Sequence, residues 1–232
     1  MAILPRFVLR CINLNFKMYK LKEKVAIHNL IKIFPQLSFL QQELGNAANT
    51  IIEAFRNGRK ILICGNGGSS ADADHFAGEL MKSFEIPRPL PLAIKKKLEK
   101  VSNETGKLLA ENLQQGIPAF SLSSNPALIT AISNDTGAAF IFAQQVVAYG
   151  KAGDVLIGFS TSGNSENVVN AMVAARAFGV KTIGFTGETG GNIKQFSDIL
   201  INVPETKTAF VQELHLPIYH AICRQVELEI YG

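Results

Sequence analysis

The sequence predicts an α/β fold in which helices cover both faces of a parallel, doubly wound sheet. Short apolar runs of strand length alternate with helix-length amphipathic stretches along most of the 232 residues. Strands that alternate with helices in this way form parallel sheets joined by right-handed crossovers. Apolar residues make up 47% and charged residues 18% of the chain. This composition supplies a large core for one domain and excludes a disordered or fibrous protein.

The first part of this alternation consists of helices and one strand. Residues 25–57 are predicted to be helical, because apolar side chains recur there at steps of three and four. Asn57 and Gly58 then form a helix stop. The run KILICG at 60–65 is apolar and ends in glycine, which is typical of a strand buried on both faces.

The same alternation continues to the C-terminus. Further strands are expected at residues 119–123, 154–160, 181–187 and 199–203. Helices are expected from Ala71 onward, at 126–135, at 166–179, near 190–196 and, as a long closing helix, at 209–231. Five parallel strands between helices favour the flavodoxin-like order 2-1-3-4-5, in which ligands bind at the carboxyl ends of the strands.

We expect a single domain over residues 25–232, with a helical insertion at about 95–117 and a basic extension at 1–24. The insertion is polar and helix-prone, with few apolar anchors. Residues 1–22 carry five basic side chains and no acidic one. We interpret the extension as a segment upstream of a start at Met18 or as a disordered tail. An ordered amphipathic arm and a targeting segment are the alternatives.

Charge, hydropathy and cysteine content exclude several classes of protein. Beyond residue 22 the chain has 18 basic and 19 acidic residues, and this nearly neutral body predicts no nucleic-acid partner. No stretch approaches 18 uninterrupted apolar residues, so we expect no membrane span. Three widely separated cysteines without a CxxC motif exclude a disulfide scaffold and indicate a cytoplasmic protein.

Two loops rich in glycine and serine each connect a strand to a helix. The first, GNGGSS, covers residues 65–70, and the second, STSGNS, covers 160–165. Both present hydroxyl and backbone N–H groups at a helix N-terminus, where the helix dipole favours an anion. Neither loop has a P-loop lysine, and Ser70 stands where a dinucleotide fingerprint needs glycine. Plain helix caps are one explanation, but two such loops in one sheet favour a phosphate site for a small molecule.

Polar side chains on two helices form a second candidate site. His75 and Glu79 are four residues apart on the helix after the first loop, and therefore share a face. Gln212 and His220 are eight residues apart, on nearly the same side of the last helix. Histidine and glutamate suit a divalent metal such as zinc, and they equally suit proton transfer. An ordinary surface contact is the alternative for the first pair, and the other two histidines are interpreted as structural.

Four motifs carry a family resemblance. They are GNGGSSADADHFAGEL at 65–80, STSGNS at 160–165, FTGETGG at 185–191 and VQELHLPIYH at 211–220. Together they resemble the sugar isomerase (SIS) domain of bacterial phosphoheptose isomerases, over most of residues 40–232 outside the insertion. The resemblance implies a five-stranded parallel sheet between helices, in a homotetramer with active sites between subunits. The activity that it implies is the interconversion of sedoheptulose 7-phosphate and D-glycero-D-manno-heptose 7-phosphate through an enediol, for heptose-containing glycoconjugates.

The resemblance also implies roles for individual residues. It matches binding of the phosphosugar substrate to Asn66, Ser69, Asp135, Ser160, Thr161, Ser162, Ser165 and Gln212. It matches the ligands of one zinc ion per active site to His75, Glu79, Gln212 and His220. Glu79 matches the catalytic base and His220 the catalytic acid.

Three departures from the family pattern concern the sugar end of the site and the subunit contacts. Ser83 stands where an arginine is usual, with Lys82 as a substitute, and Ala209 stands where an aspartate is usual. The 95–117 insertion is absent from the best-known members. The alternatives are an isomerase of another phosphosugar and a non-catalytic regulatory protein that binds phosphosugars. A relative that binds the bacterial replication initiator lacks the equivalents of Glu79 and His220, whose presence here favours an enzyme.

Overall fold

A parallel sheet of five strands forms the centre of the molecule. The structure is a computed structural model that describes residues 25–232, so the expected extension at 1–24 lies outside the described residues. The strand order is β2-β1-β3-β4-β5, which confirms the predicted fold. The strands are β1 (Ile61–Cys64), β2 (Ala119–Ser121), β3 (Val155–Phe159), β4 (Lys181–Thr186) and β5 (Ile199–Asn202).

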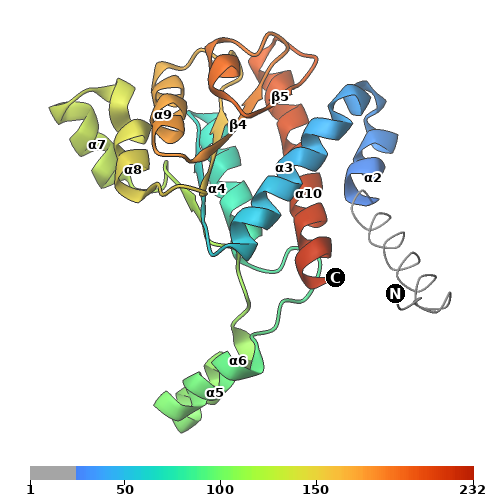
Figure 1. Ribbon diagram of the computed structural model, residues 1–232, viewed down its shortest axis with the longest axis vertical. Helices are drawn as coiled ribbons and strands as arrows, with labels where there is room; N and C mark the ends of the chain where they lie inside the picture. The colour runs from blue at the N-terminus through green and yellow to red at the C-terminus, as the bar shows by residue number, and fades with distance from the viewer. Residues whose placement is uncertain (1–24) are drawn as a thin grey trace, which may run out of the picture.

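Helices cover both faces of the sheet (Figure 1). The first face carries α3 (Gln41–Arg56), α4 (Gly68–Met81) and α10 (Thr208–Tyr231), and the second face carries α8 (Ile141–Tyr149) and α9 (Glu166–Ala177). Successive side chains of a strand point to opposite faces. Thus Ile61 and Ile63 of β1 join the first core, while Leu62 and Cys64 join the second.

The remaining elements are shorter. They are α2 (Val25–Ile33), α5 (Leu92–Val101), α6 (Asn103–Asn112), α7 (Pro126–Asp135) and the 3-10 helices η1 (Pro35–Leu40), η2 (Ala138–Phe140) and η3 (Asn192–Phe196). Within residues 25–232 no helix is both long enough and apolar enough to cross a membrane.

The structure differs from the predicted elements in three places. The helix expected at 25–57 is interrupted at Phe34, whose φ of −122° and ψ of 72° are not helical, because the proline that follows disfavours the helical conformation. Helix α4 begins at Gly68, before the expected start at Ala71. Helix α8 was not expected, because its apolar residues lie on all sides and show no clear helical period.

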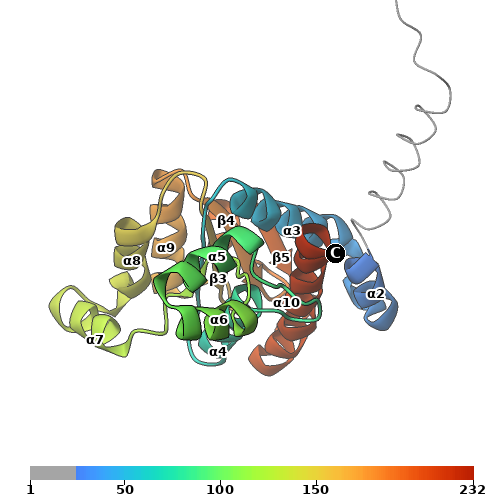
Figure 2. The same ribbon diagram turned by 90° about the horizontal axis from the view of Figure 1, so that it is seen from below.

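The segment expected as a helical insertion contains α5 and α6, which form a hairpin. In Figure 1 this hairpin projects from the body, and Figure 2 shows it from below, in front of the sheet. The chain enters the hairpin after α4 and returns from it to β2. Because β2 is parallel to its neighbour, the hairpin joins the body at the amino-terminal edge of the sheet.

The two glycine/serine loops lie at the opposite, carboxyl-terminal edge. The loop at 65–70 follows β1 and the loop at 160–165 follows β3. These strands are neighbours, with Cys64 paired to Gly158. The chain places β2 on one side of β1 and β3 on the other, so the loops meet at the point where the strand order reverses. Ligands of doubly wound folds bind at this point.

Candidate active site

The first loop turns tightly from β1 into α4. Gly67 has φ +56°, a conformation that glycine adopts without strain. A Cβ on Gly65 would lie 2.4 Å from the carbonyl oxygen of Ser69, so a larger residue does not fit there. A Cβ on Gly68 would lie 2.6 Å from the side-chain amide nitrogen of Gln212. The loop therefore brings Gln212 of α10 against the N-terminus of α4, where Ser69 is buried.

The second loop is ordered by its own hydroxyl groups. The Ser160 hydroxyl donates to the Ser165 hydroxyl at 3.0 Å, and the backbone N–H of Ser165 donates back to Ser160 Oγ at 3.3 Å. The Ser162 hydroxyl accepts the backbone N–H of Asn164 at 3.1 Å. The predicted residue Thr161 lies in the same turn and its carbonyl oxygen accepts the N–H of Gly187. The loop therefore gathers the predicted hydroxyl groups in front of α9.

A reciprocal pair of amides joins the two loops. The Asn66 side chain donates to Asn167 Oδ1 at 2.9 Å, and the Asn167 side chain donates to Asn66 Oδ1 at 3.0 Å. Asn66 belongs to the first loop, while Asn167 lies in the first turn of α9, after the second loop. The two helix N-termini are therefore held next to each other, which suits one anion bound between them.

Acidic and imidazole groups meet where α4 and α10 cross. His75 Nε2 lies 3.2 Å from Glu79 Oε1 and 3.5 Å from His220 Nε2. The side chain of Glu79 is only 13% exposed, whereas that of His75 is 44% exposed. Lys82 donates from Nζ to Glu79 Oε2 at 3.2 Å. The predicted base and the predicted acid are thus held around one imidazole ring.

Tyr219 and Asp72 fix the orientation of His75. The Tyr219 hydroxyl lies 2.9 Å from His75 Nδ1 and donates a longer hydrogen bond of 3.4 Å to Asp72. Burial raises the pKa of Asp72 to about 6, although Tyr219 and the charge of His75 act in the opposite direction. Burial and the Asp72 charge raise the pKa of Tyr219, which keeps its proton. Because the single Tyr219 proton goes to Asp72, the Tyr219 oxygen accepts from His75 Nδ1, and this contact holds Nε2 toward Glu79.

His220 lies at the edge of a cavity. Burial, followed by the positive charges of His75 and Arg224, lowers its pKa below the ordinary value for histidine. The Phe84 ring lies 5.3 Å from the imidazole, between ring centroids. The cavity measures about 400 Å³ and is lined by α2, α10 and Glu85. The imidazole is therefore partly shielded from water but open to a small molecule.

The structure assembles part of the predicted metal site. His75, Glu79 and His220 are neighbours, whereas Gln212 is placed against Gly68. Within the described residues, no three or more His, Cys, Asp or Glu side chains form a group that could hold a metal ion.

Asp135 is not brought to these residues. It lies exposed at the end of α7, where it accepts a hydrogen bond from the side chain of Asn134 at 2.9 Å. None of its described contacts reaches the two loops or His75. Its place near the sugar stays a prediction.

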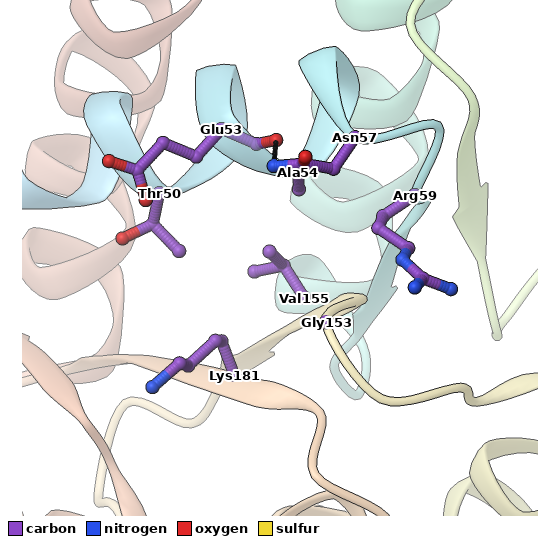
Figure 3. Close-up of a pocket in the computed structure, with 8 residues that line it drawn as sticks. All are labelled: Thr50, Glu53, Ala54, Asn57, Arg59, Gly153, Val155 and Lys181. Atoms are coloured by element: carbon purple, nitrogen blue, oxygen red, sulfur yellow. Dashed lines mark hydrogen bonds between the residues drawn. The ribbon is translucent and has the colours of Figure 1, made fainter.

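Another cavity lies at the opposite edge of the sheet. It measures about 370 Å³ and opens among the first residues of β3 and β4, below α3 (Figure 3). Its lining includes Glu53, Arg59 and Lys181, and the Asn57 side chain donates to the Glu53 carbonyl oxygen at 2.8 Å. No hydroxyl loop or imidazole cluster faces it, and parallel α/β folds bind ligands at the other edge.

Sequence reasoning missed Asp72, Asn167 and Tyr219. Tyr219 directly precedes His220 on α10, and Asp72 lies three residues before His75 on α4, so their spacing was an available signal. The pairing of Asn167 with Asn66 depends on strand order and had no local signal. His215, expected to be structural, is buried and lies 3.2 Å from the Thr186 carbonyl oxygen.

Comparison with known proteins identifies the class of protein that this fold and site represent. A family model described as the SIS domain matches residues 27–113 and 97–187. The chain therefore belongs to the SIS domain family.

Within that family, the chain is similar to phosphoheptose isomerases. It is 40% identical to the phosphoheptose isomerase of Aliarcobacter butzleri over 191 residues. This alignment covers 82% of this chain and 87% of that protein. It is 37% identical over 209 residues to that of Clostridium acetobutylicum, covering 90% and 93% of the two chains. The solved structure of the phosphoheptose isomerase from Neisseria gonorrhoeae is similar with a TM-score of 0.66 and 33% identity, over 95% of this chain and 98% of that chain.

Proposed function

We propose that this chain is a phosphoheptose isomerase that interconverts sedoheptulose 7-phosphate and D-glycero-D-manno-heptose 7-phosphate through an enediol. The observation that carries the proposal is the shielded Glu79 carboxylate, with His75 and His220 next to it. Glu79 and His75 lie on α4, whose N-terminus belongs to the first loop, and His220 reaches them from α10. The proposed site thereby combines a phosphate-binding site with an acid–base pair, as an aldose–ketose isomerase requires.

The two loops would hold the phosphate. The proposed ligands are Asn66, Ser69, Ser160, Thr161, Ser162 and Ser165, together with the free backbone N–H groups of the two helix N-termini. Hydroxyl groups and backbone N–H groups suit a monophosphate on a sugar, and binding it would fix the orientation of the reacting carbons.

The length of α4 favours a long phosphosugar. Glu79 follows Ser69 by ten residues, a separation of roughly 15 Å along a helix axis. The side chain of Glu79 leans back toward the helix N-terminus and shortens this span. A phosphate held by the loops and a carbonyl carbon beside Glu79 must still be separated by several carbons. A seven-carbon sugar phosphate suits this separation better than a three-carbon one.

The proton transfers would be divided between two residues. Glu79 would remove the proton from the carbon next to the carbonyl group, and His220 would donate a proton or a hydrogen bond to the oxygen. Each such group contributes typically ~10²–10⁴-fold to the rate. Gln212 lies between the loop and this pair along α10 and would bind a sugar oxygen.

A divalent ion, zinc in the proposal, would be held by His75, Glu79, His220 and Gln212 after these side chains rearrange, because in their described positions they do not form a metal-binding group. Donor atoms of a tetrahedral zinc site lie roughly 3.3 Å apart, close to the 3.2 and 3.5 Å separations around His75 Nε2. Tyr219 holds the His75 ring so that Nε2 faces Glu79, which is the orientation that two ligands of one cation need. Gln212 would have to rotate to join the set. When bound, the ion would supply a Lewis acid for the developing oxygen anion.

The proposal includes a homotetramer in the cytoplasm with active sites between subunits. Asp135 is exposed at the end of α7 and, among the described residues, bonds only to Asn134 there, so its side chain is free to face a neighbouring subunit in this assembly. A neighbouring subunit would then complete the sugar end of the site.

The first experiment is NMR of the zinc-supplied protein with sedoheptulose 7-phosphate in heavy water. We expect formation of the aldose with deuterium at the enediol carbon, and loss of both in Glu79→Gln. Metal content measured on the same samples should give one zinc per chain and a clear decrease in His75→Ala.

Glu53→Gln, an exposed change at the far edge of the sheet, is the matched control and should retain full activity. If neither product nor exchange appears while the sugar phosphate still binds, the catalytic assignment for this sugar fails. Other phosphosugars would then be tested, and inactivity with all of them would indicate the regulatory alternative.

A further inference from the structure

The α5–α6 hairpin exposes an unusual amount of apolar surface. Val101 is 88%, Leu92 66% and Leu108 61% exposed, and Leu109 and Leu113 are also exposed. All of these side chains lie within 22 residues of the chain. Exposed apolar side chains that are concentrated in this way are typical of a surface that binds a partner.

The hairpin lacks internal support. No residue of α5 is buried, and in α6 only Gly106 and Ala110 are. Among the described elements, α5 and α6 pack extensively only on each other. Isolated helices of ten residues are marginal in water. A second surface is therefore needed to cover this pair of helices.

Hydrogen bonds anchor the base of the hairpin to the body. Pro89 and Gln114 form a bridge between its two connecting segments, and the N–H of Gln115 donates to the Arg88 carbonyl at 2.8 Å. Arg88 itself is buried and donates to Glu227 of α10 at 2.8 Å. The hairpin is thus held at a defined position on the body.

The charges of the two helices are complementary. Helix α5 carries four lysines and one glutamate, whereas α6 carries one lysine and two glutamates. A partner that presents a basic helix to α6 and an acidic helix to α5 would match both. A second hairpin related by a two-fold axis does this, because α5 of each copy then meets α6 of the other.

We propose that the hairpin is a docking surface for a second copy of this chain. Two hairpins form a four-helix bundle in which their exposed apolar side chains are buried and α5 of one protomer packs on α6 of its partner. The contact lies at the amino-terminal edge of the sheet, away from the two loops. It goes beyond the proposed function and does not depend on it.

The first test is the mass of the full-length protein by light scattering, with its dissociation constant by sedimentation. In the double variant Val101→Glu, Leu108→Glu we expect the hairpin contact to weaken by at least about tenfold and the assembly to halve in mass. Phe178→Glu, which places the same charge on an exposed apolar residue at the end of α9, is the control. It should leave the mass unchanged, and an unchanged mass in the double variant would overturn the proposal.

A charge-reversal experiment identifies the occupant as a second copy. One chain carries Lys96→Glu and Lys100→Glu, which makes both of its helices acidic. The other carries Glu104→Lys and Glu111→Lys, which makes both basic. Neither chain should pair through its hairpin alone, and an equal mixture should form mixed pairs.

If each reversed chain pairs as well as the wild type, the hairpin does not hold two copies together. Binding of sedoheptulose 7-phosphate by calorimetry, measured on the same samples, separates the two proposals. Hairpin variants that still bind the sugar phosphate but lose the contact support the docking surface. Failure of the wild-type protein to bind the sugar phosphate counts only against the isomerase.

Discussion

At the scale of single residues, the reciprocal bond between Asn66 and Asn167 has the most direct consequence for phosphate binding. Asn167→Ala removes both hydrogen bonds and replaces no predicted phosphate ligand, although Asn66 loses its partner. Each net hydrogen bond contributes about 1 kcal/mol, so we expect the loss of one or both to weaken binding of the sugar phosphate by roughly 5- to 30-fold. Isothermal titration calorimetry measures this change.

The matched control for this change is Asn170→Ala. Asn170 lies one turn further along α9 and donates to the Ala139 carbonyl oxygen at 3.0 Å, away from the two loops. Its loss should leave the affinity for the sugar phosphate unchanged. Equal affinities for wild type and Asn167→Ala would mean that the loops hold their positions without the amide pair.

At the scale of elements, the buried pair of Arg88 and Glu227 attaches the segment after α4 to the last helix. Their side chains are 0% and 1% exposed, and Glu227 also accepts the backbone N–H groups of Phe84, Glu85 and Ile86. Glu227→Gln leaves a buried guanidinium without its counter-charge. We expect the free energy of unfolding to decrease by about 3–5 kcal/mol in a urea titration.

Glu229→Gln provides the comparison two residues further along α10. Glu229 pairs with Arg56 at 3.0 Å, but the arginine side chain is 56% exposed. Exposed pairs contribute about 1 kcal/mol or less. If the free energy of unfolding decreased equally in the two variants, burial of the Arg88–Glu227 pair would not increase its contribution to stability.

The elements themselves were largely predictable, because each strand is a compact apolar run with a glycine or polar boundary. The exceptions have local causes. Pro35 interrupts the helical pattern of residues 25–57, and the apolar surface of α8 extends around the helix and hides its period. The side-by-side position of the two loops followed from strand order alone, since β1 and β3 are neighbours.

The sequence predicts those parts of the candidate site in which two residues are spaced to share one face of a helix. His75 and Glu79 are such a pair, and His220 was placed near them by the resemblance. The contact of Tyr219 with His75 depends on how α4 crosses α10, which no local pattern encodes. Asp135 contacts only Asn134 among the described hydrogen bonds, and its contact with the sugar stays a prediction.

At the scale of the whole molecule, His215 makes folding stability depend on pH. It is fully buried, with Phe159 and Phe185 against its ring. Burial lowers its pKa from 6.5 to about 4, although its contact with the Thr186 carbonyl oxygen acts in the opposite direction. Between these values the unfolded chain binds a proton that the folded chain does not. The free energy of unfolding therefore decreases as the pH falls from 6.5 to about 4.

The total loss from this one group amounts to roughly 3 kcal/mol over that range, at about 1.4 kcal/mol per pH unit. Urea titrations of the wild type and of His215→Phe between pH 7.5 and 4.5 measure it. The aromatic replacement keeps the packing against Phe159 and Phe185 but cannot take up a proton. We expect its stability to change less steeply with pH than that of the wild type. Parallel curves for the two proteins would show that His215 accepts its proton in the folded state, and that its burial does not exclude the charge.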